Sequence, residues 1–297
     1  MPQTHILTGA GDGAAQPAIR RIRPADLTDA LAKGWDDFSA MPSHAIFLCV
    51  IYPVIGIVLA MVTFGYTILP MLFPLAAGFA LVGPLAAIGL YELSRRREAN
   101  LDVSASDALD VVRSPSIGAI VALGLMLMVI FLVWVAAAQA IYVANFGYEP
   151  PASIGKFIRD MLTTRPGWNV ILLGNAVGFL VALLVLMISV VSFPLLLDRD
   201  VGAATAVLTS VRAVLANPVT MALWGLIVAV LLLLGSLPAF LGLTVVLPVL
   251  GHATWHLYRK VVEPGATPRA EFLPPRKIHH SAADFPASLF RGDKEKE

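Results

Sequence analysis

Four long stretches of the 297-residue sequence contain no Asp, Glu, Lys or Arg, and this feature most constrains the fold. They are residues 44–91, 114–148, 166–197 and 213–258. A helix needs about 20 apolar residues to cross about 30 Å of hydrocarbon. Each stretch is therefore long enough for one or two membrane-spanning helices.

The stretch lengths predict six spans. Two spans fit the first stretch, with a break near 66–70, and two fit the last, with a break near 236–238. The middle stretches each hold one span, at about 117–140 and 169–193. The last pair is the tightest, because 46 residues must hold two helices and a turn. A single broken or re-entrant segment is the alternative there.

Composition agrees with a protein that faces lipid. Hydrophobic residues make up 58% of the chain and charged residues only 14%, whereas soluble domains carry roughly 25% charged residues. The net charge of +1 gives no reason to expect a nucleic-acid partner. The single cysteine, Cys49, lies in an apolar run, so we expect neither a disulfide framework nor a Cys-based metal site.

The two ends differ in composition from the centre. Residues 1–19 lack the basic and apolar regions of a signal peptide, so the first hydrophobic helix is expected to serve as an uncleaved targeting signal. We expect 1–19 to be a disordered tail. Residues 263–297 are rich in proline and charge and predict a second one. The predicted six-helix transmembrane domain is 20–262.

Basic residues predict the orientation. With six spans, both termini lie on one side, and 18 Lys and Arg residues fall on that side. Only Lys156, Arg159 and Arg165 fall on the other. The positive-inside rule places both termini in the cytoplasm, so we expect a multi-pass inner (plasma) membrane protein.

A pattern recurs three times along the chain. Amphipathic segments at 26–38, 107–113 and 203–215 each lead to a proline and then to a span. The apolar faces predicted for the first and third are Leu27, Leu31, Trp35 and Phe38, and Ala204, Leu208, Val211 and Leu215. The second span after each segment, predicted span 2, 4 or 6, contains an internal proline, at Pro84, Pro194 or Pro248, and has a polar end.

The repeat unit is an interfacial helix plus two spans. The predicted fold class is therefore an all-α polytopic membrane helix bundle of about six transmembrane helices in three tandem repeats. The amphipathic helices can lie in the headgroup layer, or they can be packed connectors that orient the next span. The external segment 145–168, with a short helix at 152–162, is the best candidate for an external contact.

Catalytic groups are missing from the predicted spans. No Asp, Glu, Lys or Arg lies well inside a span, as proton pumps require. Asp36 and Asp37 point about 100° apart on a helix, so they predict a solvated face and not an acid/base pair. Glu92 is expected to form an ion pair with Arg95 and Arg96. No catalytic residue and no cofactor is predicted.

His252 and His256 are the one plausible ligand pair. Their i, i+4 spacing places both imidazoles on one helix face, as in a metal site or a haem edge. Polar capping of a helix end, beside the interfacial aromatics Trp255 and Tyr258, is the alternative. His44, at the start of the first span, is the one further histidine that could approach them.

Neutral polar residues inside the spans allow two interpretations. Gln139, Asn175, Ser189, Ser192 and Thr244 suit hydrogen bonds between helices or the lining of a solute path. Glycines such as Gly78, Gly174 and Gly178 suit close helix contact.

Three stretches carry a family resemblance. They are 30–38 followed by Pro42, Phe73-Pro74 with 83–96, and 192–199. These residues resemble a bacterial family known as an integral-membrane domain of unknown function, over about 20–262. Some members are labelled cytochrome c oxidase. Such an oxidase needs about six histidine ligands in its spans, and this chain has six histidines in all, three of them in the tails. The resemblance therefore implies at most an accessory role beside an oxidase.

Three functions follow as hypotheses. The first is a non-enzymatic inner-membrane protein that assists or scaffolds a membrane complex, for example a respiratory one. The second is a transporter or channel for a small neutral or lipidic solute, since repeats and Pro-broken helices are common in transporters. The third is a haem- or metal-binding subunit. An unrecognised membrane enzyme is the remaining hypothesis.

Overall fold

The computed structural model describes residues 17–41, 69–81, 83–238 and 240–264. Its elements are α1 (Pro24–Ala40), η2 (Leu69–Met71), α4 (Leu72–Leu81), α5 (Gly83–Ala86), α6 (Ile88–Glu98), η3 (Ala105–Arg113), α7 (Ile117–Phe146), α8 (Ile154–Thr163), α9 (Arg165–Ser189), α10 (Ser192–Asp198), α11 (Ala203–Ala216), α12 (Pro218–Ser236) and α13 (Leu243–Val261). The described residues form no strand beyond one isolated bridge between Ile19 and Val262. The predicted all-α membrane bundle is confirmed.

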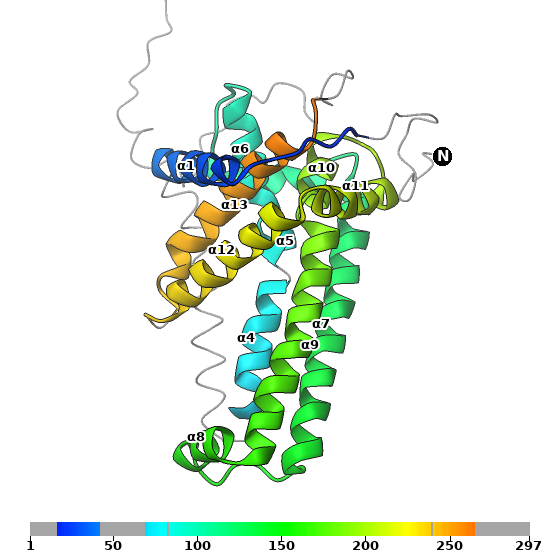
Figure 1. Cartoon of the computed structure of the whole chain (residues 1–297). Helices are drawn as coiled ribbons and strands as arrows, with labels where there is room; N and C mark the ends of the chain where they lie inside the picture. Colours follow the sequence, from blue (N-terminus) through cyan, green and yellow to red (C-terminus); the bar gives the residue numbers. More distant parts are fainter. Residues whose placement is uncertain (1–16, 42–68, 82, 239, 265–297) are drawn as a thin grey trace, which may run out of the picture.

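A column of three helices forms the long axis of the molecule. Helices α7 and α9 run side by side with α4 against them, and α8 crosses their foot (Figure 1). Trp134 joins the column, because its indole Nε1 donates to the Pro74 carbonyl at 2.8 Å. Gly78 and Gly178 make room for this ring: a Cβ on either glycine would lie 2.9 Å from it. No atom lies within 4 Å of a Cβ at Gly174.

Three helices in the described residues are long and apolar enough to cross a membrane. They are Ile117–Phe146, the combined α9 and α10 at Arg165–Asp198, and Pro218–Ser236. These helices coincide with the predicted third, fourth and fifth spans. The predicted first span lies outside the described residues, as do His44 and Cys49. The described part of the second is divided among η2, α4, α5 and α6, and the predicted Gly83-Pro84 opens α5.

The sixth predicted span differs from a full crossing. Helix α13 continues through Pro248, but its residues from Leu250 onward are largely buried among polar elements. Seven residues, 243–249, precede this buried half, and seven residues rise only about 10 Å. In Figure 1 the turn between α12 and α13 ends part way along α7 and α9.

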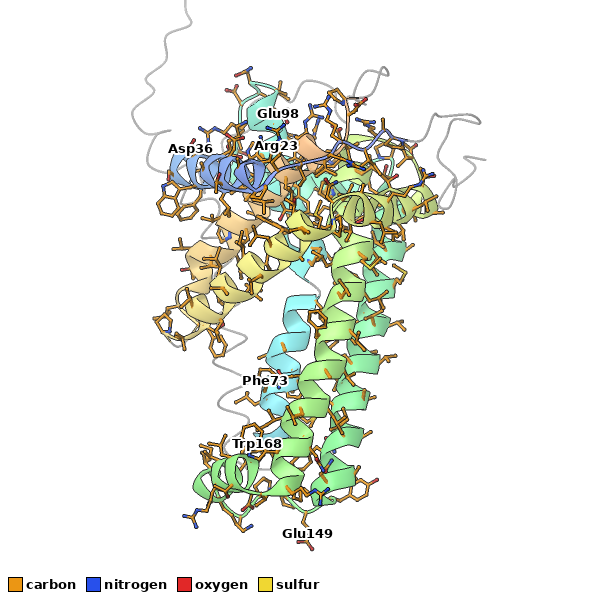
Figure 2. All side chains as sticks on the ribbon, viewed as in Figure 1. Arg23, Asp36, Phe73, Glu98, Glu149 and Trp168 are labelled. Carbon is orange, nitrogen blue, oxygen red and sulfur yellow. The ribbon has the colours of Figure 1, made fainter. Side chains whose placement is uncertain are left out.

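Most charged side chains gather at one end of the molecule, which we call the polar head. It consists of α1, α6, η3, α10, α11 and the second half of α13. Figure 2 places Arg23, Asp36 and Glu98 there, with Glu149 and Trp168 at the opposite end. The head also fills a core: Trp255 and Tyr258, predicted to be interfacial, are buried because α6, α10 and α13 enclose them.

The three predicted interfacial segments end in the same way. At Met41, Ser114 and Asn217 the backbone N–H donates to the carbonyl three residues earlier, at 3.0–3.1 Å, and a proline follows. Counting back from that proline, positions 1, 4, 5 and 8 are buried in all three, and positions 2, 3 and 6 are exposed. The three segments thus share a burial pattern, while the predicted threefold repeat of whole units stays a prediction.

The apolar faces predicted for α1 and α11 differ in how far they are buried. In α1, Leu27 and Phe38 are buried but Trp35 is 53% exposed. In α11 the predicted face is the outer one, since Leu208 and Leu215 are exposed while small and polar residues pack inward. An outward apolar face suits a helix in the headgroup layer.

Candidate functional site

The candidate site lies where α1, α6 and α13 meet in the polar head. Helix α1 packs along α13 so closely that the two backbones touch at Gly34. A Cβ on Gly34 would lie 2.7 Å from Ala253 Cβ and 2.8 Å from the Val249 carbonyl oxygen. Only glycine permits this approach, which brings the next turn of α1 against the histidines of α13.

Asp37 is the centre of the site, and it is buried. Its Oδ2 lies 2.8 Å from His256 Nε2 and accepts a 2.6 Å hydrogen bond from the Ser94 hydroxyl. Its Oδ1 accepts from Arg97 at 2.9 Å. The sequence-based assignment of Asp37 to a solvated face is therefore wrong, while Asp36 is exposed as predicted. One step of a helix turns a side chain by about 100°, enough to separate the two carboxylates.

Ser94 links Asp37 to the second histidine. The Ser94 Oγ lies 2.7 Å from His252 Nδ1, and His252 is fully buried. An ionised carboxylate only accepts hydrogen bonds, so the single hydroxyl proton goes to Asp37 and His252 Nδ1 is left as the donor to Ser94. The buried Nε2 then carries a lone pair and has no hydrogen-bond partner within the described residues.

Two pKa shifts follow from this arrangement. Burial raises the pKa of Asp37, but the hydrogen bonds from His256 and Ser94 outweigh burial and hold it below its usual value. Burial lowers the pKa of His252 from 6.5 to about 4, although the Asp37 charge acts in the opposite direction. At neutral pH the site therefore holds an ionised Asp37 beside an uncharged His252.

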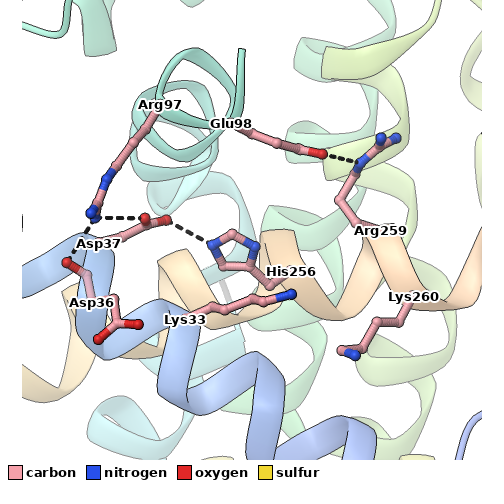
Figure 3. A pocket seen from close by; sticks show the side chains of 8 residues that line it. All are labelled: Lys33, Asp36, Asp37, Arg97, Glu98, His256, Arg259 and Lys260. Carbon is pink, nitrogen blue, oxygen red and sulfur yellow. Dashed lines mark hydrogen bonds and ion pairs between the residues drawn. The ribbon is translucent and has the colours of Figure 1, made fainter. Parts of the chain in front are cut away.

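A pocket of about 410 Å³ opens beside His256 (Figure 3). It is lined by acidic, basic and imidazole side chains from the same three helices: Lys33, Asp36, Asp37, Arg97, Glu98, His256, Arg259 and Lys260. The basic residues are paired. Arg259 Nε lies 3.0 Å from Glu98, and Lys260 Nζ lies 2.8 Å from Asp29. The pocket wall is thus a set of ion pairs that join α1, α6 and α13.

A second buried ion network lies behind the pocket. The Glu92 carboxylate accepts from Arg95 at 2.7 Å and from Arg96 at 2.8 Å, as predicted. Arg96 also reaches Asp107 and Asp110 in η3. These pairs fix η3 against α6, so they are structural contacts.

Comparison with known proteins adds a family. Residues 72–198 match the family model described as Predicted integral membrane protein (DUF2189). The match confirms the resemblance to an integral-membrane family of unknown function over this central part, and the wider range of about 20–262 stays a prediction. It does not show the cytochrome c oxidase label. No curated protein and no solved structure matches the chain.

The site joins the DUF2189 region to the segments on either side of it. Ser94 and Arg97 lie within the matched residues, whereas Asp37, His252 and His256 lie outside them. Sequence reasoning missed Ser94 and Arg97. Their spacing of three residues on one face of α6 was the available signal, but it does not name the partner helix.

The two predicted ligand residues, His252 and His256, face the Asp37 carboxylate. His256 Nε2 contacts Asp37 Oδ2, and His252 Nδ1 lies 4.0 Å from the same oxygen. Within the described residues, no group of three or more His, Cys, Asp and Glu side chains is placed to hold a metal ion. The arrangement suits a hydrogen-bond network that holds helices together more than it suits a ligand site.

The neutral polar residues of the spans bond within their own helices. The Asn175 amide donates to the Ile171 carbonyl at 2.7 Å, and the Ser189 hydroxyl donates to the Val185 carbonyl at 2.6 Å. Thr244 likewise donates to the Leu241 carbonyl. Gln139 lines a small pocket of about 80 Å³ at the end opposite the polar head. Asn175, Ser189 and Thr244 thus each donate a hydrogen bond to a nearby backbone carbonyl.

Proposed function

We propose that this integral membrane protein is a non-enzymatic accessory or scaffolding subunit of a membrane complex, with a respiratory oxidase as the first partner to test. The observation that carries the proposal is the mutual pairing of the groups around Asp37. Each has a partner on another helix: Ser94 and Arg97 on α6, and His256 on α13. Such a network holds helices together, because its polar groups form hydrogen bonds to one another.

The site also lacks the access that catalysis needs. Ser94 and His252 are fully buried, so no substrate atom reaches the Ser94 hydroxyl without displacing α1. A nucleophile must lie within hydrogen-bond reach of its base and open to substrate. Here the first condition holds and the second does not, which favours a structural role.

The geometry gives less support to transport. Asn175 and Ser189, the two groups that best suited a midplane cavity, donate to carbonyls of their own helix. A transporter site is typically built from unwound helices whose free backbone groups face the substrate. Helix α9 is continuous through Asn175, and Ser189 is its last residue.

The proposal includes an inner-membrane location with both termini in the cytoplasm. The polar head then faces the cytoplasm, where Lys and Arg are enriched. A folded head that joins α1 to α13 offers a partner one fixed surface on that side.

Affinity purification of the full-length tagged chain in mild detergent, followed by mass spectrometry, tests the proposal. Cells rich in respiratory complexes are the source, and a tagged multi-pass protein of unrelated function is the control. We expect one membrane complex to be recovered with this chain and not with the control. Recovery of the chain alone would contradict the proposal.

A further inference from the structure

Helix α8 has an apolar surface that the rest of the described structure covers only in part. Phe157 and Met161 are half-buried toward the column of α7 and α9. Ile154, Ile158 and Leu162 are 46%, 51% and 56% exposed. Their i, i+4, i+8 spacing makes one continuous stripe along the helix.

The direction of this stripe follows from helix geometry. At about 100° per residue, the stripe lies between the side that packs on the column and the side that carries Lys156, Arg159 and Thr163. In Figure 1, α8 lies across the foot of α7 and α9. The stripe therefore borders the apolar layer that the column occupies, and the polar side faces away from it.

The depth of α8 follows from α9. About 20 residues cross the hydrocarbon, so a span that ends at Ser189 begins near Asn169. The Asn169 amide donates to Asn145 at 3.2 Å, a polar contact that suits the edge of the apolar layer. Trp168 is 49% exposed there, and its indole donates to the Leu162 carbonyl. Tryptophan at this depth is typical of a membrane–water interface.

The charges of α8 match a phosphate layer. Arg159 is exposed, and no acidic group of the described residues pairs with it. Lys156 is 60% exposed and pairs with Asp160 on the same helix. A basic polar side opposite an apolar stripe is the arrangement of helices that lie in the headgroup layer.

We propose that α8 binds the lipid surface of the leaflet opposite the polar head. Ile154, Ile158 and Leu162 insert among the acyl chains, while Lys156 and Arg159 contact anionic phosphate groups. The chain is then held by interfacial contacts at both ends of its spans.

Site-directed spin labelling of the full-length protein in vesicles tests the insertion. Nitroxides at Ile158→Cys and Ile154→Cys, in a Cys49→Ser chain, are compared with a nitroxide at Thr163→Cys on the polar side. We expect positions 158 and 154 to be accessible to oxygen and protected from a water-soluble nickel chelate, and position 163 to show the reverse. Access of the chelate to position 158, or of neither reagent because protein covers the stripe, would overturn the proposal.

Lipid quenching tests the charge contribution. A fluorophore at position 158 is expected to be quenched more by brominated phosphatidylglycerol than by brominated phosphatidylcholine. A basic residue near a membrane surface contributes about 1 kcal/mol, so Arg159→Gln should reduce this preference about fivefold. Lys33→Gln, at the other end of the molecule, is the matched control. Equal quenching by both lipids in the unsubstituted protein would contradict anionic-lipid binding.

Discussion

At the scale of residues, the site around Asp37 could not be predicted from the sequence. Asp36 and Asp37 are identical in chemistry and adjacent in the chain, yet one is exposed and the other is buried beneath two helices. The partners that distinguish them lie 57 residues away at Ser94 and 219 residues away at His256. The i, i+4 histidines were visible in the sequence. Their shared carboxylate was not, because no local pattern links α1 to α13.

Acidification is expected to destabilise the polar head. The pKa of His252 is 6.5 in the unfolded chain and about 4 in the folded one, so the unfolded chain binds more protons between those values. Stability therefore falls as the pH is lowered from about 6.5 to about 4, by about 3 kcal/mol at most. The lowered pKa of Asp37 acts in the same direction, since its stabilisation is lost as the pH falls through the folded pKa.

Melting temperatures in detergent at pH 7.5 and pH 5 measure this effect. We expect a lower value at pH 5, and a smaller difference between the two for His252→Gln. Equal melting at the two values would contradict the account of His252.

A methyl group at Gly34 is expected to separate α1 from α13. The added Cβ would meet backbone atoms of α13 at 2.7–2.8 Å, which a side-chain rotation does not relieve. Overpacking of this kind costs roughly 1–3 kcal/mol. Gly174→Ala is the control, because no atom lies within 4 Å of its added Cβ.

The free energy of unfolding of both glycine variants gives the comparison. Gly34→Ala should be clearly less stable than the unsubstituted protein, and Gly174→Ala should match or exceed it. A Gly34→Ala protein as stable as Gly174→Ala would show that α1 does not pack on α13 as described.

At the scale of elements, the uncharged stretches predicted α7, α9 and α12 because length and hydropathy alone define a span. They also predicted a helix after the break near 236–238, where α13 lies, although α13 is not among the helices apolar enough to cross a membrane. Its second half, with the predicted interfacial residues Trp255 and Tyr258, fills the core of the head. The recurring helix-and-proline pattern was readable, and the burial before Pro115 and Pro218 follows it. What each helix packs against was not readable, because the contacts join residues far apart in the chain.

The turn between α12 and α13 is expected to lie within the apolar layer. The seven residues of α13 before its buried half rise only about 10 Å, and α12 runs obliquely to α7 and α9 (Figure 1), so we expect the hairpin to end before the far surface. Leu237, at the turn, is 72% exposed and so faces lipid. Leu237→Cys in a Cys49→Ser chain should resist a membrane-impermeant thiol reagent added from the α8 side of intact membranes. Tyr148→Cys, at an 88% exposed site near α8, is the positive control. Equal labelling of the two would indicate a full sixth span.

At the scale of the whole molecule, charged groups and apolar helices lie in separate parts of the protein. Most charged groups of α1, α6, η3 and α13 are paired within the head, and polar groups of the spans such as Asn175 and Ser189 are neutral and bond within their own helix. Composition and charge distribution predicted this division. Only the hydrogen-bond distances within the Asp37 cluster indicate that this cluster holds helices together.

A double-mutant cycle between Asp37 and His256 tests the central claim, that the cluster holds the head together. The variants are Asp37→Asn, His256→Gln and the pair, and the measurement is the free energy of unfolding in detergent at pH 7.5. Residues in one buried network couple by roughly 0.5–3 kcal/mol. We predict a coupling in this range, with each single variant less stable than the unsubstituted protein. Additive effects, or a more stable Asp37→Asn protein, would contradict the claim and indicate that the cluster is kept for chemistry.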